Sequence, residues 1–136
     1  NSAGLESMMT TMAKGVAYIS GNAYVFVSPL IGVLGAFISG SNTVSNILFA
    51  SLQFETAKIL NMSTLLIVAL QVIGGAVGNM VCVNNVVAVC ATVGTPGVEG
   101  KIIRRNAIPM FIMAMAVAIV IGVLIYNGVD PFPVGK

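Results

Sequence analysis

The sequence predicts an all-helical integral membrane protein that combines a re-entrant helical hairpin, a discontinuous transmembrane helix and one uninterrupted transmembrane helix. Hydrophobic residues make up 57% of the 136 residues and charged residues only 7%, whereas about a quarter of the residues in a soluble domain are charged. The apolar stretches are long and lack the period-two alternation of membrane-spanning strands, which excludes an outer-membrane barrel. The spans are therefore expected to be helices.

The composition also excludes several classes of function. The six basic residues are scattered and the net charge is only +2, so no nucleic-acid partner is expected. The sequence has no His, and Cys82 and Cys90 fit neither a metal-binding spacing nor a disulfide framework, so we interpret them as small packing residues. Nucleophile and base pairs, paired carboxylates and phosphate-binding loops are also missing from the pattern. We expect neither an enzyme nor a metal or cofactor site.

The N-terminal segment, residues 1–27, predicts a packing helix or a partial span. Apolar side chains recur at helical spacing from Leu5 to Ile19. The chain begins at Asn1 part-way into this pattern, and neither a basic region nor a cleavage site of a signal peptide precedes it. We therefore expect the chain to be a fragment of a larger membrane protein.

Residues 28–60 predict a re-entrant hairpin with a polar tip. The arm Pro29–Gly40 would be about 18 Å long and the arm Ile47–Leu60 about 21 Å, against a hydrocarbon core of about 30 Å. Between them, Ser39–Asn46 contributes six hydroxyl or amide side chains, which are costly at membrane depth unless they line a cavity or ligand site. The alternative is a single span, Pro29–Phe54, whose polar side chains bond back to the helix carbonyls.

Residues 64–93 predict a broken transmembrane helix, because this apolar stretch is longer than one span needs and has glycines and asparagines near its middle. The asparagines are Asn79, Asn84 and Asn85. Unwinding there would expose backbone groups and helix ends at the middle of the bilayer. Alternatively, Gly74 and Gly78 form a GxxxG packing face and the helix stays whole. The asparagines favour the break.

Residues 108–126 predict the one full transmembrane helix, an uninterrupted apolar run of about 28 Å with Pro109 in its first turn. Half of the basic residues, Lys101, Arg104 and Arg105, lie in the connection before it. The positive-inside rule places that connection in the cytoplasm. The broken helix then begins outside, and the hairpin before it opens to the outside.

The polar clusters predict binding rather than catalysis. If Ser41, Asn42 and Thr43 form the hairpin tip, the second arm begins there and directs its free N–H groups and positive dipole end at a ligand. The three asparagines of the broken helix would add donors and acceptors. The predicted membrane segments contain no Arg, so a small anion or polar solute would be held by backbone and amide groups, and carbonyl oxygens could also hold a cation.

Glu55 is the carboxylate that the sequence places near the membrane. It could pair with Lys58 across one helical turn as an interfacial ion pair. A more specific interpretation makes Glu55 a proton carrier.

Three blocks of sequence together resemble the C-terminal part of the bacterial L-lactate permease family. They read GAFISGSNTVSNILFASLQ at Gly35–Gln53, VALQVIGGAVGNMVCVNNVVAV at Val68–Val89 and GVEGKIIRRNAIP at Gly97–Pro109. The second block is the most specific of the three. The chain departs from the family pattern at Asn84, where a His is usual, and in length, because family members are several times longer.

This resemblance implies a multi-pass secondary transporter of the inner membrane that carries L-lactate, and related 2-hydroxy acids such as glycolate, together with protons. The wider ion-transporter superfamily is built from inverted repeats, each with a Ser-Asn-Thr hairpin tip facing an unwound helix. The chain would then be one half of such a transporter, with the missing N-terminal half and the lipid bilayer as its partners. The candidate substrate-binding residues are Ser41, Asn42, Thr43, Ser45, Asn46, Gly78, Asn79, Asn84 and Asn85.

Two alternatives from other classes remain. The chain could be a helical membrane assembly module that does not transport, or a degenerate remnant of a transporter. An ion channel is a weaker alternative, because the sequence has neither rings of charge nor a repeated carbonyl filter.

Overall fold

The computed structural model describes residues 8–129 and residue 131, and the regular elements in that part of the chain are all helical. In order they are α1 (Met8–Ser20), the 3₁₀ turn η1 (Gly21–Ala23), α2 (Tyr24–Ser39), α3 (Asn42–Ile59), α4 (Thr64–Gly78), α5 (Val83–Thr92) and α6 (Glu99–Tyr126). Three stretches are long and apolar enough to cross a membrane, Met8–Ser39, Thr64–Thr92 and Glu99–Tyr126. These findings confirm the predicted class of helical membrane protein.

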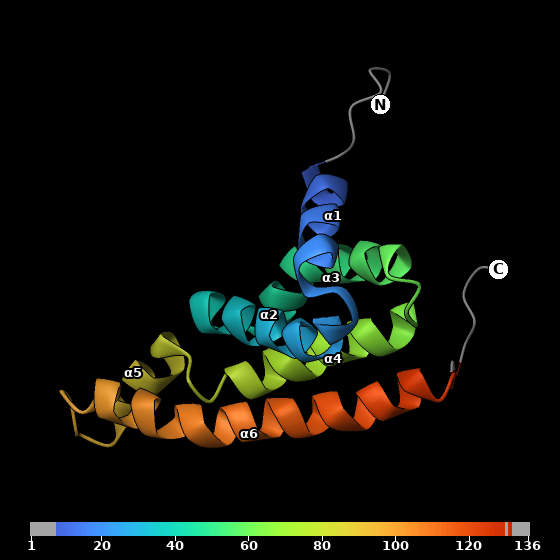
Figure 1. The fold of residues 1–136 in the computed structure, drawn as a ribbon. Helices are drawn as coiled ribbons and strands as arrows, with labels where there is room; N and C mark the ends of the chain where they lie inside the picture. The colour runs from blue at the N-terminus through green and yellow to red at the C-terminus, as the bar shows by residue number, and fades with distance from the viewer. Residues whose placement is uncertain (1–7, 130, 132–136) are drawn as a thin grey trace.

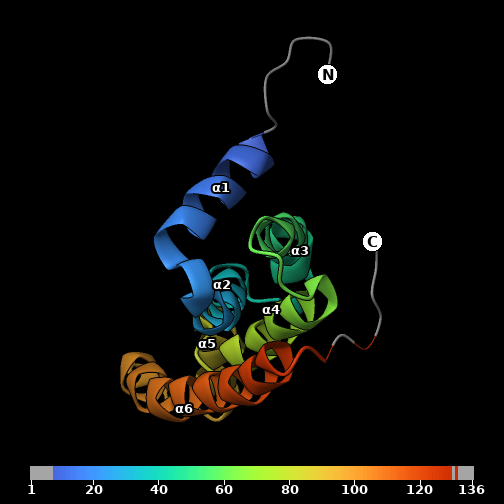
Figure 2. The ribbon, with the colours of Figure 1, turned by 45° about the vertical axis from the view of Figure 1, so that its right-hand side comes forward.

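The helices α2, α3 and α4 pack together, and α6 lies along the side of α2 and α4 (Figure 1). Helix α1 leaves this group at a steep angle, as both views show (Figures 1 and 2). It packs against α3. The stretch Met8–Ser39 is therefore bent at η1 and is not one straight rod. The predicted start of the first helix at Leu5 lies outside the described residues.

The two arms of the hairpin are longer than predicted. Helix α2 begins at Tyr24 and has 16 residues, with Pro29 in its interior, and α3 begins at Asn42 and has 18 residues. Ser41 explains the early start of α3, because its hydroxyl caps the helix by accepting a hydrogen bond from Val44 N at 3.4 Å. Arms of about 24 and 27 Å approach the thickness of the hydrocarbon core, so arm length no longer separates a re-entrant hairpin from two spans.

In residues 64–93 the broken helix and the GxxxG packing face, which were alternatives, are each partly right. Helix α4 ends early, and it also forms a close-packed face. A Cβ atom added at Gly78 would lie 2.8 Å from the backbone of Val33, and one added at Gly74 would collide with the backbone of Pro29. The glycines thus bring the α4 backbone against α2, as in a GxxxG contact. The helix nevertheless stops at Gly78, and α5 starts only at Val83.

Helix α6 is longer than the predicted run of residues 108–126, because it begins at Glu99 and has 28 residues. The basic cluster therefore lies exposed on its first turns and not in a loop, which suits the good helix propensity of Lys and Arg. Pro109 lies inside the helix and not in its first turn. The residues of α6 that are buried are Ala114, Ala118 and Ile121.

The apolar core lies between α2, α3, α4 and α6. It is formed by Tyr24, Val25, Ala57, Leu66, Ile67, Leu70, Ala118 and Ile121. Cys82 and Cys90 are buried and unbridged, which confirms their interpretation as packing residues.

Candidate functional site

The hairpin tip and the helix break lie against each other. The tip consists of Gly40 and Ser41, and a Cβ atom added at Gly40 would lie 3.0 Å from Asn84 Nδ2 and 3.4 Å from Cys82 Sγ. Gly40 also ends α2 with a φ of 76°, in the left-handed region that glycine adopts without strain. The fold thus brings the two polar segments that were predicted to face each other into contact.

Two helices begin at this contact. The N-cap residues are Ser41 for α3 and Cys82 for α5. The first turns of a helix have N–H groups without an intrahelical partner and carry the positive end of the helix dipole. The start of each helix can therefore favour a small anion.

Two asparagines near this contact have a buried side-chain oxygen that no other described residue bonds, Asn42 Oδ1 and Asn79 Oδ1. Asn42 Oδ1 rests on α4 at Gly75, where an added Cβ atom would collide with it. An unpaired buried amide oxygen destabilises the folded protein by about 1–3 kcal/mol. Such groups are uncommon in folded proteins, and a functional role is one reason for them. Within the described part of the chain, these are the site residues with an unpaired buried oxygen.

The nine predicted site residues fall into three groups. Those at the tip and the break are Ser41, Asn42, Thr43, Asn79, Asn84 and Asn85, and Thr43, Asn84 and Asn85 among them are exposed. Gly78 and Ser45 are buried in helix packing, where the Ser45 hydroxyl donates to Gly32 O at 2.9 Å. Asn46 is half-buried, and its Oδ1 lies 3.4 Å from Gln71 Nε2.

A chain of buried hydrogen bonds joins α2, α3 and α4 beneath the tip. Tyr24 Oη donates to Gln53 Oε1, and Gln53 Nε2 donates to Gln71 Oε1 at 2.9 Å. Gln71 Nε2 then donates to Ser45 Oγ at 3.0 Å. All four side chains are fully buried. Neither glutamine is among the predicted site residues, although a lone polar side chain in an apolar helix, as Gln71 is in α4, is itself a signal of a role.

A second contact that the sequence did not predict links α6 to the helix break. Asn106 Nδ2 donates to Met80 O at 3.1 Å. Met80 lies between α4 and α5, where the backbone has left the helical pattern. The side chain therefore satisfies a carbonyl that the break releases.

Glu55 lies far from the tip, about 20 Å along α3 from Asn42 at 1.5 Å per residue. Its side chain is half-buried. The neighbouring Lys58 ammonium lies 5.5 Å from the centre of the Phe54 ring. A role of Glu55 in proton movement would thus be indirect and not at the tip itself.

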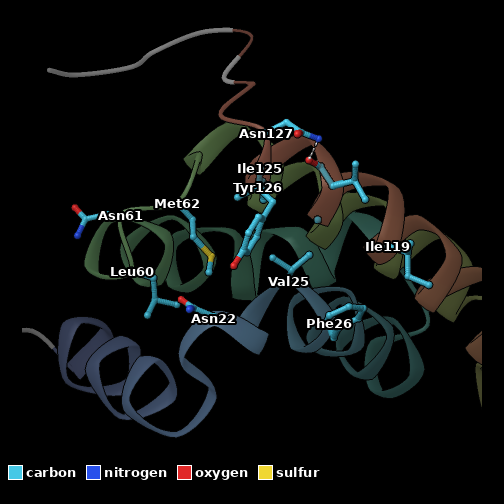
Figure 3. Close-up of a pocket in the computed structure, with 12 residues that line it drawn as sticks. Asn22, Val25, Phe26, Leu60, Asn61, Met62, Ile119, Ile125, Tyr126 and Asn127 are labelled. Atoms are coloured by element: carbon cyan, nitrogen blue, oxygen red, sulfur yellow. Dashed lines mark hydrogen bonds between the residues drawn. The ribbon is translucent and has the colours of Figure 1, made fainter.

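A pocket of about 670 Å³ lies at the opposite end of the helices, between the start of α2, the α3–α4 turn and the end of α6 (Figure 3). Figure 3 shows the Tyr126 side chain lying between Met62 and Val25. The lining is mainly apolar and includes none of the predicted site residues. This pocket is therefore distinct from the contact between the tip and the break.

Comparison with known proteins gives one consistent family. Residues 1–127 match the family model described as L-lactate permease. A putative L-lactate permease of Haemophilus influenzae is 44% identical over 116 residues, which is 85% of this chain and 22% of that protein. The L-lactate permease of Escherichia coli K12 is 41% identical over 104 residues, covering 76% of this chain and 18% of the relative.

A glycolate permease of Escherichia coli K12 is 38% identical over 115 residues, which is 85% of this chain and 20% of that protein. The chain thus spans about a fifth of the length of these curated relatives. No solved structure matches the chain significantly.

Proposed function

The chain belongs to the L-lactate permease family, and from this premise we propose that it is part of a secondary transporter for L-lactate and related 2-hydroxy monocarboxylates such as glycolate. The transporter acts in the inner membrane and moves its substrate together with protons. The names of the relatives support the substrate class, because they are lactate and glycolate permeases.

The observation that carries this proposal is the contact between the hairpin tip and the helix break, seen at Gly40 and Asn84. A 2-hydroxy monocarboxylate needs N–H donors for its carboxylate and a donor or acceptor for its hydroxyl. The first turns of α3 and α5 supply free N–H groups, and Asn42, Thr43 and Asn85 supply side-chain groups. Since α2 to α5 contain no Arg, this part of the site would hold the carboxylate by dipoles.

The hairpin formed by α2 and α3 is proposed to be re-entrant, with its tip at membrane depth. Polar groups at that depth need partners, and the packing of Asn42 on Gly75 in α4 supports a protected position for the tip. The chain spans about a fifth of its relatives, so a second, inverted hairpin from the remaining part would complete the site. The substrate would then lie between two tips.

Glu55 is the proposed proton carrier. It is a half-buried carboxylate on the same helix as the tip, and protonation of a carboxylate removes a charge that is costly at membrane depth. Its distance from Asn42 means that it would act through the movement or stability of α3. Substitution Glu55→Gln should therefore abolish accumulation driven by a proton gradient and leave exchange of labelled for unlabelled L-lactate intact.

The test of the substrate and the site is uptake of labelled L-lactate by the full-length protein that contains this chain. Substitutions Asn42→Ala and Thr43→Ala should each lower uptake at low substrate concentration about tenfold, because each removes a hydrogen bond to a charged ligand. The matched control is Ser51→Ala, an exposed hydroxyl further along α3.

Equal uptake in all three variants, at equal membrane levels, would contradict the site. Wild-type protein that takes up no L-lactate would instead favour a membrane module that does not transport. Collapse of the proton gradient should reduce accumulation in the wild type, and unchanged accumulation would contradict proton coupling.

A further inference from the structure

The buried side-chain amides of Gln53 and Gln71, beneath the hairpin tip, can place their oxygen and nitrogen atoms in only one orientation. Gln53 Nε2 lies 3.0 Å from Ser28 O, and Gln71 Nε2 lies 3.3 Å from Ser45 O. A backbone carbonyl can only accept a hydrogen bond, so the nitrogen of each glutamine must face its carbonyl. The orientation of both amide groups is therefore set by the backbone, and Gln71 Oε1 is left facing Gln53 Nε2.

Asn46 is the next amide along this chain of bonds. Gln71 Nε2 lies 3.4 Å from Asn46 Oδ1. The two N–H groups of Gln71 Nε2 are shared among Ser45 Oγ, Ser45 O and Asn46 Oδ1. An amide nitrogen cannot accept, so the oxygen of Asn46 faces Gln71 and its Nδ2 group points the other way. Asn46 is half-buried and lies one helical turn after Asn42, on the same face of α3. Its Nδ2 group thus points away from Gln71, on the face of α3 that also carries Asn42.

We propose that Gln53 and Gln71 are positioning residues that make Asn46 present N–H donors, and not its oxygen, to the substrate. This inference rests on the proposed function and adds the source of selectivity, namely preference for a carboxylate over a neutral analogue of the same shape. If the Asn46 amide turned by half a rotation, its Nδ2 would oppose the Gln71 Nε2 donor. The buried chain prevents that turn.

The size of the effect follows from the charge of the ligand. A hydrogen bond to a charged group is stronger than one to a neutral group, so the expected preference is about tenfold or more. An amide free to turn would offer its oxygen to a neutral ligand and lose this preference. Loss of the buried chain should therefore change the selectivity and not merely the total uptake.

The experiment compares inhibition of labelled uptake by unlabelled L-lactate and by L-lactamide, in which an uncharged amide replaces the carboxylate, in the full-length protein. Substitution Gln71→Met keeps the length of the side chain and removes its donors. The lactate preference, taken as the ratio of the two inhibition constants, should fall about tenfold. A general packing defect would weaken both inhibitors equally and leave the ratio unchanged.

The matched control is Ser28→Ala. It removes another buried hydrogen bond between α2 and α4, from Ser28 Oγ to Ile67 O at 3.2 Å, but keeps the Ser28 carbonyl that orients Gln53. The ratio of inhibition constants should stay at the wild-type value in this variant. A ratio that falls as far in Ser28→Ala as in Gln71→Met would overturn the proposal, because orientation of Asn46 would then not be the cause.

A second variant keeps the proposal testable if Gln71→Met does not reach the membrane. Substitution Asn46→Asp keeps an oxygen facing Gln71 and replaces the outward Nδ2 donors with an oxygen that shares a negative charge, so the lactate preference should again fall. An unchanged ratio in Asn46→Asp, or in Gln71→Met, would overturn the inference while leaving the transport function standing. Wild-type protein without L-lactate uptake would overturn the proposed function itself, and this inference with it.

Discussion

The group of helices α2, α3 and α4 and the long helix α6 are both apolar, yet they are packed in opposite ways. Within the group, backbones touch at glycines and five polar side chains are fully buried. Of the most apolar 18 residues in α6, only 17% are buried, compared with 56% of the most apolar 18 residues in the stretch Thr64–Thr92. Of the three stretches that could cross a membrane, the one with the most apolar window is thus the least enclosed, so hydropathy identifies a membrane helix but not the part that carries the candidate site.

The largest difference between the two regions is expected at their glycines. An added methyl group in Gly74→Ala would collide with the backbone of Pro29, which cannot move as a side chain can, so we expect a loss of about 3 kcal/mol or more. In α6, Gly100→Ala meets open space and should change stability by less than about 0.5 kcal/mol. Thermal unfolding of the purified full-length protein in detergent measures both. Equal melting temperatures for Gly74→Ala and Gly100→Ala would contradict the expected difference between the two regions.

A smaller difference is expected for polar side chains. Substitution Gln53→Leu removes the donor to Ser28 O and Gln71 Oε1 and the acceptor of the Tyr24 hydroxyl and should destabilise the protein by about 2–3 kcal/mol. The comparison on α6 is Asn127→Ala, which removes an exposed hydrogen bond to Val123 O and should cost less than about 0.5 kcal/mol. Unfolding in denaturant is the measurement. A cost for Asn127→Ala as large as that for Gln53→Leu would show that exposure does not govern these bonds.

The next largest loss of stability is expected at the polar contact that joins α6 to the helix break. Substitution Asn106→Leu removes the donor to Met80 O and should cost about 1–2 kcal/mol. The cost should be local, so backbone amides near the break should exchange hydrogen faster in Asn106→Leu. The control is the neighbouring exposed residue, in Arg105→Ala, which should leave this exchange unchanged. Unaltered exchange in both variants would mean that the break does not depend on α6.

The smallest effect is expected on the exposed face of α6. Ile112 is 62% exposed, so Ile112→Val should change the melting temperature by an amount equivalent to less than about 0.5 kcal/mol. A larger loss would indicate that this face is covered by another part of the full-length protein. The variant therefore measures how far the contrast between the two regions holds in the whole molecule.

The sequence alone was sufficient for the helical membrane class, for the break near Asn79 and for the polar tip at Ser41. These features depend on local composition, because polar side chains in an apolar run mark places where the chain turns or binds. The helix boundaries were predicted less well. Capping by Ser41 and the helix propensity of the basic residues before Pro109 extend helices beyond the apolar pattern.

The buried contacts could not be predicted from local pattern, because they join residues distant in sequence. Gln71 meets Ser45 and Asn106 meets Met80 only after the helices have packed. A single glutamine in an apolar helix signals that some partner exists, but which atom it faces is decided by backbone carbonyls on two other helices. The contact of Gly40 with Asn84 likewise depends on how α2 and α4 are brought together by Gly74 and Gly78.

The claim that the hairpin tip and the helix break bind the substrate together is tested most directly by protection of introduced cysteines. In full-length protein with Cys82→Ser and Cys90→Ser, the rate of modification by a thiol reagent would be measured for Thr43→Cys on the tip and Asn85→Cys on α5, with Tyr18→Cys on α1 as the exposed control. L-lactate should slow modification at both the tip and α5 and leave the α1 position unaffected. Protection at neither the tip nor α5, in variants that still take up L-lactate, would contradict the claim.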